Sequence, residues 1–152
     1  MMVFLSFSSL DRAAAERIQL ALLGANHKVF FDEANLPPGG DYHSRIKAAI
    51  SACDAYVFLI SPDSVQDGRY AQSELKQVKA KWPKPWGRVL PVMLRPTDLS
   101  LVDAYLAAVT ILEPKGNVAA EVMAQLDKLK ASRKFRRLGS VEETHINLEL
   151  AE

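Results

Sequence analysis

The six residues Ala55–Ile60, which read Ala-Tyr-Val-Phe-Leu-Ile, limit the possible folds more than any other stretch of this chain. The run is apolar throughout and shows none of the alternation of a strand with one face in water. Such a segment is typical of a strand that is covered on both faces, as in a parallel sheet. It predicts a sheet with helices packed on both sides.

Strand-like and helical segments alternate along most of the chain, as in α/β proteins. The predicted strands are residues 3–7, 28–31, 55–60, 88–94 and 108–112, and the predicted helices are residues 12–23, 42–52, 70–82, 99–106 and 117–131. We therefore predict an α/β, flavodoxin-like three-layer fold with a five-stranded parallel sheet of order 2-1-3-4-5 flanked by helices.

Single residues refine the predicted elements. Asp11 is expected to cap the first helix, and Gly24 is expected to end it as a C′ glycine. Pro91 would be awkward in a strand that is paired on both sides.

The chain of 152 residues fits one domain, which we place at residues 1–131, with residues 132–152 as a C-terminal tail, an extra helix or a linker. A net charge of +1 argues against nucleic acid or an anionic membrane as a partner. No apolar run is long enough to span a membrane, and the N-terminus lacks the basic region of a signal peptide. We expect a cytoplasmic protein.

The cysteine and histidine content gives no sign of a metal site or a structural disulfide. Cys53 is the single cysteine, so no intramolecular disulfide is possible. The three histidines, His27, His43 and His145, are scattered without metal-ligand spacing. We expect neither a bound metal nor a cofactor.

Glu74 is a candidate functional residue because of its place in the predicted topology. It lies at the start of the helix that follows the third strand, one turn after Tyr70. By itself it has the features of an exposed surface glutamate. In this layout, however, ligands bind beyond the carboxyl ends of strands 1 and 3, and this helix begins at that end. The topology therefore brings Glu74 to the expected pocket.

Two other kinds of protein with this sheet lack support in the loops. Response-regulator receivers need acidic residues after strand 1 and an aspartate after strand 3, where this chain has Ser8-Ser9 and Ser61. Flavodoxins need a phosphate-binding loop after strand 1, but Ser8-Ser9-Leu10-Asp11 contains no glycine.

Three stretches of the chain, in matching order and spacing, resemble a Toll/interleukin-1 receptor (TIR) domain of the bacterial type. Residues 3–11 resemble the first conserved box, and residues 30–40 resemble the BB loop. Residues 60–64 and 70–75 resemble the exit of strand 3 and the helix that carries the family's glutamate. The resemblance covers roughly residues 3–131.

The departures from the family pattern are informative. Ser8-Ser9 replaces a basic pair that some members carry, and Tyr70 stands where tryptophan is common. No Phe-Trp box of the animal signalling members is visible near the last helix. Its absence weakens an animal-adaptor role and leaves the bacterial, enzymatic one.

The resemblance implies that the protein is a hydrolase that cleaves the bond between nicotinamide and ribose in NAD, which is its substrate. The products would be nicotinamide and ADP-ribose, or a cyclic ADP-ribose. Ordinary glycosidases use two carboxylates because the leaving oxygen must be protonated. Nicotinamide leaves as a neutral molecule, so one carboxylate suffices, and we assign Glu74 to stabilise the cationic ribose.

The resemblance also implies a set of substrate-binding residues around Glu74. They are the aromatic walls Phe7, Phe31 and Tyr70, the polar partners Ser8, Ser9 and Asp11, and the loop residues Asp32, Leu36 and Gly39. Each has a plainer explanation: core packing for the phenylalanines, helix capping for the serines and Asp11, and loop bracing for Asp32.

The BB loop gives the chain an expected surface for self-association. Its residues Asn35, Leu36, Pro37, Pro38, Gly39 and Gly40 form an apolar tip on a glycine-hinged base. We expect it to dock on a neighbouring TIR domain, in dimers or filaments, or to cover the pocket. Another TIR-containing or sensor protein is a further expected partner.

Two functions remain open from the sequence. The first is an NAD glycohydrolase activated by self-association, acting in bacterial immunity such as anti-phage defence or, after secretion into a host cell, in virulence. The alternative is a non-catalytic scaffold that mediates homotypic TIR–TIR signalling contacts.

Overall fold

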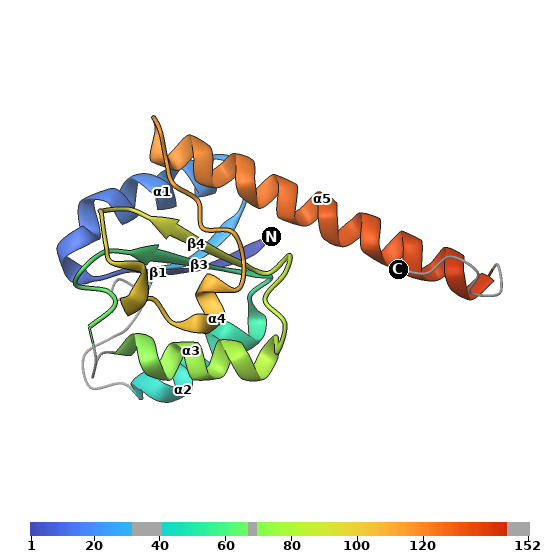
Figure 1. Ribbon diagram of the computed structural model, residues 1–152, viewed down its shortest axis with the longest axis horizontal. Coiled ribbons are helices and arrows are strands. Elements are labelled where there is room, and N and C mark those ends of the chain that lie inside the picture. Colours follow the sequence, from blue (N-terminus) through green and yellow to red (C-terminus); the bar gives the residue numbers. More distant parts are fainter. Residues whose placement is uncertain (32–40, 67–69, 146–152) are drawn as a thin grey trace.

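The computed structural model describes residues 1–31, 41–66 and 70–145, with residues 70–73 and 133–145 described as backbone only. A four-stranded parallel sheet of order β2-β1-β3-β4 lies at its centre. Its strands are β1 (Met2–Ser6), β2 (Lys28–Phe31), β3 (Ala55–Ile60) and β4 (Val89–Met93). Figure 1 shows this sheet between two layers of helices, which confirms the predicted α/β class.

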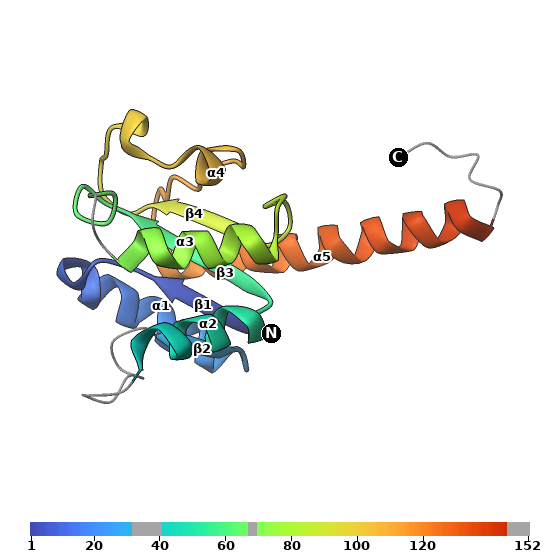
Figure 2. The same ribbon diagram turned by 90° about the horizontal axis from the view of Figure 1, so that it is seen from below.

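Five α-helices and two short 3₁₀ turns are described around the sheet. They are η1 (Ser9–Asp11), α1 (Arg12–Gly24), α2 (Tyr42–Ala52), α3 (Tyr70–Lys81), η3 (Leu99–Leu101), α4 (Ala104–Ala107) and α5 (Val118–His145). Helices α2, α3 and α4 cover one face of the sheet, and α1 and α5 cover the other (Figures 1 and 2).

The strand β3 shows why the sheet must be covered on both faces. All six of its residues are at most 2% exposed. Tyr56, Phe58 and Ile60 belong to the core beneath α2 and α3, while the alternate residues belong to the core beneath α1 and α5. Side chains of a strand point to opposite faces in turn, so a continuous apolar run supplies both cores.

The expected fifth strand, residues 108–112, is reduced to one parallel bridge between Val92 and Leu112. Leu112 N–H donates to the Pro91 carbonyl at 2.9 Å, and Met93 N–H donates to the Leu112 carbonyl at 2.8 Å. The carbonyl and the nitrogen of Pro91 therefore face the outer side of β4, away from β3. Because the proline nitrogen carries no hydrogen, it offers no donor to a further strand.

Asp11 occupies the predicted N-cap position of α1, but neither predicted cap forms in the expected way. The Asp11 side chain makes no capping hydrogen bond and instead pairs with Arg95, which lies after β4. Gly24 is the last residue of the helix, and the left-handed backbone conformation falls on Asn26, with φ of 66°. Asparagine tolerates this conformation better than most residues, so it ends the helix as a glycine would.

Helix α5 is longer than the sequence pattern predicts, because it continues through residues 132–145. Asn117 caps its start, accepting the Ala120 N–H at 2.9 Å. Figures 1 and 2 show its second half extending beyond the sheet. Among the described residues, no helix combines the length and the apolar run that crossing a bilayer requires.

Candidate functional site

The carboxyl edge of the sheet between β1 and β3 is the expected place for a ligand. These two strands are neighbours, with Ser6 opposite Phe58, but the chain goes from β1 to β2 on one side and from β3 to β4 on the other. Loops that leave adjacent strands in opposite directions open a crevice at that edge. Glu74 approaches it from α3, one turn after the helix begins.

The Glu74 carboxylate is buried rather than solvated. The residue is 2% exposed. Its Oε1 accepts a hydrogen bond from Ser6 Oγ at 2.7 Å and one from the Tyr56 hydroxyl at 3.3 Å. The two donors come from β1 and β3, so this one carboxylate joins α3 to both central strands.

The surroundings of Glu74 are mostly apolar and aromatic. Tyr56 is 0% exposed, and its ring lies 5.5 Å from the Phe4 ring and 6.3 Å from the Phe58 ring. Burying a carboxylate there costs free energy unless donors compensate it, as the two hydroxyls do. A charge in such surroundings acts strongly on a nearby positive charge, because little water screens it.

Ser6 and Tyr56 were not predicted as partners of Glu74, although the sequence carries a signal for them. Ser6 interrupts an otherwise apolar strand, and Tyr56 puts a hydroxyl into the most apolar strand of the chain. Both are buried, with exposed fractions of 4% and 0%. A buried hydroxyl needs a partner, and the two strands are neighbours, which points to a shared acceptor.

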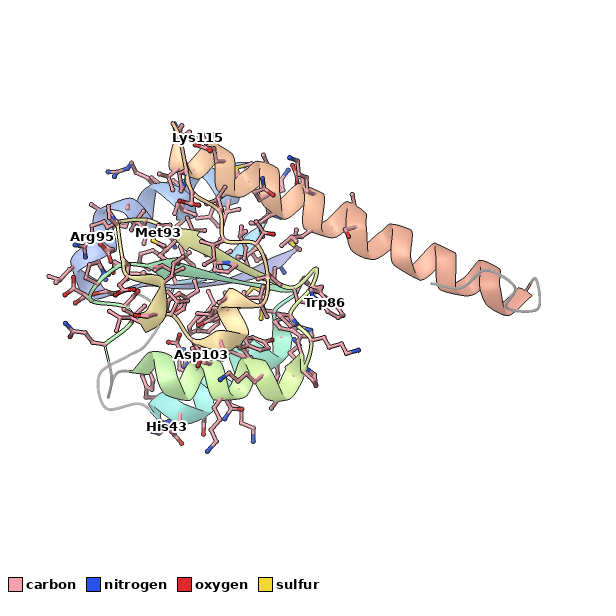
Figure 3. The ribbon with its side chains drawn as sticks, in the orientation of Figure 1. His43, Trp86, Met93, Arg95, Asp103 and Lys115 are labelled. Atoms are coloured by element: carbon pink, nitrogen blue, oxygen red, sulfur yellow. The ribbon has the colours of Figure 1, made fainter. Side chains whose placement is uncertain are left out.

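A second polar cluster lies at the same edge, where Arg95 joins two carboxylates. Its Nε donates to Asp11 Oδ1 at 2.8 Å, and its Nη2 donates to Asp63 Oδ2 at 2.6 Å. Asp63 first and then Asp11 raise the pKa of Arg95 above its ordinary value. Because the three residues follow β3, β1 and β4, the cluster ties three strand ends together (Figure 3 labels Arg95).

Asp11 is the buried member of this cluster, at 5% exposed. Its Oδ2 has no hydrogen-bond partner among the described residues. Arg95 and Asp63 were not predicted from the sequence, although charged residues within three positions of a strand end are a signal for this edge of the sheet.

The turn that leads from β3 towards α3 is held by two serines. Ser61 N–H donates to Ser64 Oγ at 2.9 Å, and Ser64 N–H donates to Ser61 Oγ at 3.2 Å. Both residues are buried. This reciprocal pairing satisfies the backbone where the strand ends, and it fixes the direction in which the chain leaves the sheet.

The predicted aromatic walls Phe7 and Phe31 lie with the core beneath α1 and α5, on the other face of the sheet from Glu74. Their ring centroids are 4.6 Å apart, and the Arg12 guanidinium lies 5.4 Å from the Phe31 ring. Phe31 is 1% exposed and Phe7 is half-buried. The structure therefore does not bring these two rings together with Glu74.

Of the remaining predicted site residues, some are described in the structure and others are not. Ser8 caps η1 by accepting the Leu10 N–H at 3.4 Å, and Ser9 is exposed. The side chain of Tyr70 lies outside the described residues, as does the whole stretch that holds Asp32, Asn35, Leu36, Pro37, Pro38, Gly39 and Gly40.

Two cavities of the described structure lie away from Glu74, which lines neither of them. One, of about 720 Å³, lies between the starts of α1 and α5 and includes Asp11, Arg17 and Arg95 in its wall. The other, of about 800 Å³, follows the outer side of β4. Within the described residues, no three His, Cys, Asp or Glu side chains come together as metal ligands would.

Comparison with known proteins supports one fold family. The family model described as the TIR domain matches residues 3–129. The TIR domain of the Toll-related receptor TRR-2 from Hydra magnipapillata superposes with a TM-score of 0.66 at 18% identity, covering 84% of this chain and 97% of that one. No curated protein matches the sequence.

Two larger proteins contain a similar part. A metazoan TIR-STING receptor from C. gigas, in complex with 2',3'-cGAMP, gives a TM-score of 0.68 at 19% identity over 82% of this chain and 38% of that chain. The TIR domains of the activated Roq1 resistosome give 0.51 at 24% identity over 60% and 55%. At these identities the structural likeness shows the fold alone.

Proposed function

Since the chain belongs to the TIR domain family, we propose that it cleaves the bond between nicotinamide and ribose in NAD, with Glu74 as the catalytic carboxylate. The observation that carries this proposal is the position of Glu74. Its carboxylate is 2% exposed, lies at the carboxyl edge between β1 and β3, and is held by two hydroxyl donors.

The reaction needs one carboxylate and no general acid. The bond between the ribose carbon and the nicotinamide nitrogen breaks with both electrons going to the nitrogen, so the positively charged ring leaves as neutral nicotinamide. The ribose is left short of electrons, and a nearby carboxylate stabilises this developing charge. Water then attacks the ribose carbon and loses a proton to give ADP-ribose, or an adenine nitrogen attacks to give a cyclic product.

Self-association is part of the proposal. A 2%-exposed carboxylate reaches a substrate only through a pocket beside it, and we propose that assembly of several copies completes this pocket. Activity per molecule should then rise with protein concentration. A role in bacterial defence by NAD depletion, or in interference with a host's signalling, follows from the same activity.

The test is NAD turnover with product identification by mass spectrometry across a series of protein concentrations. Glu74→Gln keeps the size of the side chain and an oxygen that can accept from Ser6 and Tyr56, but removes the charge. We expect turnover to fall at least about 100-fold, because removing one charge-stabilising group from an active site has an effect of this size. Glu74→Ala should be equally inactive.

Glu16→Gln is the matched control, because Glu16 is an exposed glutamate on α1 that forms an ion pair with Arg12 at 3.8 Å. It should keep the turnover of the parent protein. Parent-level turnover in Glu74→Gln would contradict the assignment of the catalytic residue. Absence of NAD turnover by the parent at every concentration would contradict the activity itself.

A non-catalytic TIR scaffold is the second candidate, and the burial of Glu74 is the observation that favours it. A carboxylate that accepts two core hydroxyls would also serve as a plain tie between α3 and the sheet. A scaffold would consume no NAD even when crowded. It would associate with further copies of itself or with another TIR-containing or sensor protein. Substitution of Leu36 or Pro37 would abolish the self-association.

A further inference from the structure

We propose that Ser6 and Tyr56 are positioning residues for the reaction, because their hydroxyls hold the Glu74 carboxylate in the orientation in which it stabilises the cationic ribose. This inference rests on the proposed NAD cleavage and concerns the same site. Neither residue is assigned a contact with NAD. Each acts through Glu74.

The contacts converge on one atom. Ser6 Oγ lies 2.7 Å and the Tyr56 hydroxyl 3.3 Å from Glu74 Oε1. The shorter distance is in the range of a charge-assisted hydrogen bond between a hydroxyl and a carboxylate, and the longer one is weaker. Ser6 should therefore contribute more than Tyr56.

Both donors are fixed by the sheet. Ser6 is the last residue of β1, is 4% exposed and lies opposite Phe58 of β3. Tyr56 is fully buried, and its ring packs against Phe4 and Phe58. Donors that cannot move need no reorganisation when charge develops on the substrate, which is the condition for effective electrostatic stabilisation.

The cost of this arrangement argues for a role beyond folding. A fold that needed only contact between α3 and the sheet could use an apolar side chain in place of Glu74, with no hydroxyls opposite. Replacing a buried charged group and its partners by apolar residues of similar volume is often neutral or stabilising. Instead, three polar groups meet inside the apolar cluster of Phe4, Phe58 and Leu75.

The test compares steady-state NAD kinetics of the parent with Ser6→Ala and Tyr56→Phe, which remove only the hydroxyls. We expect kcat to fall about tenfold for Ser6→Ala and by roughly threefold for Tyr56→Phe, since hydrogen bonds to charged groups are worth this much or more. KM should stay within about twofold, because neither hydroxyl is proposed to touch NAD. Ser6→Thr, which restores a hydroxyl, should recover kcat.

Tyr105→Phe is the matched control for Tyr56→Phe. The Tyr105 hydroxyl donates to the Trp82 carbonyl at the end of α3, away from Glu74. Its removal should leave kcat unchanged. If Ser6→Ala does not fold, Ser6→Cys gives a nearly isosteric side chain with a weak donor and should show a similar loss.

The outcomes separate this inference from the proposed function. Parent-level kcat in folded Ser6→Ala and Tyr56→Phe, with Glu74→Gln inactive, would overturn the positioning role and leave the NAD activity standing. Lower melting temperatures with unchanged kcat would assign the hydroxyls to the fold alone. A parent without NAD turnover would overturn both. A drop in kcat that Ser6→Thr reverses supports the proposal.

Discussion

The two edges of the sheet use their polar side chains in different ways. At the amino edge, Lys81 Nζ donates to the carbonyls of Ile50, Ser51 and Cys53 at 2.8, 2.7 and 2.6 Å. Arg88 likewise donates to the Asp54 carbonyl at 3.1 Å. At the carboxyl edge, Glu74 and Asp11 accept from the side chains of other elements. Figure 3 shows Trp86 and Arg95 near these opposite ends.

This difference indicates which substitutions should change stability alone and which should change activity as well. Cations at the amino edge satisfy carbonyls that the end of α2 and the following loop leave open, so they complete the backbone hydrogen bonding of the fold. The carboxylates of Glu74 and Asp11 at the carboxyl edge instead accept hydrogen bonds from side chains of other elements, and Glu74 is the proposed catalytic group. Substitutions at the amino edge should therefore change stability alone, and those at the carboxyl edge should also change activity.

After the substitutions of Glu74 itself, Arg95→Met at the carboxyl edge should have the largest effect. The change frees Asp63 and leaves the buried Asp11 carboxylate without its cation, so both the melting temperature and NAD turnover should fall. Displacement of the loop that leads to α3 can cost up to about 100-fold in turnover. Thermal unfolding and kinetics measured on the same preparation check this.

Two variants sharpen the Arg95 result. Arg95→Lys should not rescue turnover, because one ammonium group does not replace the two separate contacts of the guanidinium. Lys79→Met breaks the exposed pair with Asp103, at 3.1 Å, and should change neither quantity noticeably. Full activity in Arg95→Met would mean that the cluster has no part in the site.

Lys81→Met tests the amino edge and should rank next. Loss of three bonds to carbonyls should lower the free energy of unfolding by about 2 kcal/mol. The kcat of the folded protein should not change. Denaturant unfolding and steady-state kinetics give the two values, and a lower kcat would break the proposed division between the edges.

Tyr105→Phe should have a smaller effect at the same edge, lowering the free energy of unfolding by about 1 kcal/mol through loss of the bond to the Trp82 carbonyl. Burial raises the pKa of Tyr105 to about 12. Its protonated form is therefore favoured by folding, and this stabilisation is full below about pH 10 and is lost as the pH rises towards 12. Stability measured over that interval should fall less steeply in the variant.

The smallest expected effect concerns Cys53, at the end of α2. Burial raises the pKa of its thiol to about 11, and the thiol donates to the Ile50 carbonyl at 3.2 Å. At pH 8 only about one thiol in a thousand is ionised. A thiol reagent should not label the native protein and should label it once after unfolding. Rapid native labelling would mean that this edge opens.

The architecture was predictable from the sequence, because it depends on repeated patterns. The apolar run 55–60 predicts a buried strand, and its place between amphipathic helices predicts a parallel three-layer sheet. The position of Glu74 at the carboxyl edge also follows from topology alone. These predictions use many residues at once, so no single substitution decides them.

Predictions that rested on one residue were less secure, because a contact distant in sequence can override a local preference. Asp11 is a good capping residue, but Arg95, 84 positions later, takes its carboxylate. Gly24 is a good helix end, but Asn26 adopts the left-handed conformation. The burial of Glu74 depends on hydroxyls from two strands, one of them 68 positions earlier in the chain. Helical spacing cannot report such partners.

The orientation of Pro91 has a consequence for solubility. An edge strand offers a row of unpaired donors and acceptors to which a strand of another molecule can add, and this is a common start of aggregation. On the outer side of β4, proline removes one donor, and Leu112 occupies the neighbouring groups. The sheet is thereby kept from growing across molecules. Assembly of the kind proposed above would then proceed through chosen surfaces instead of through uncontrolled strand addition.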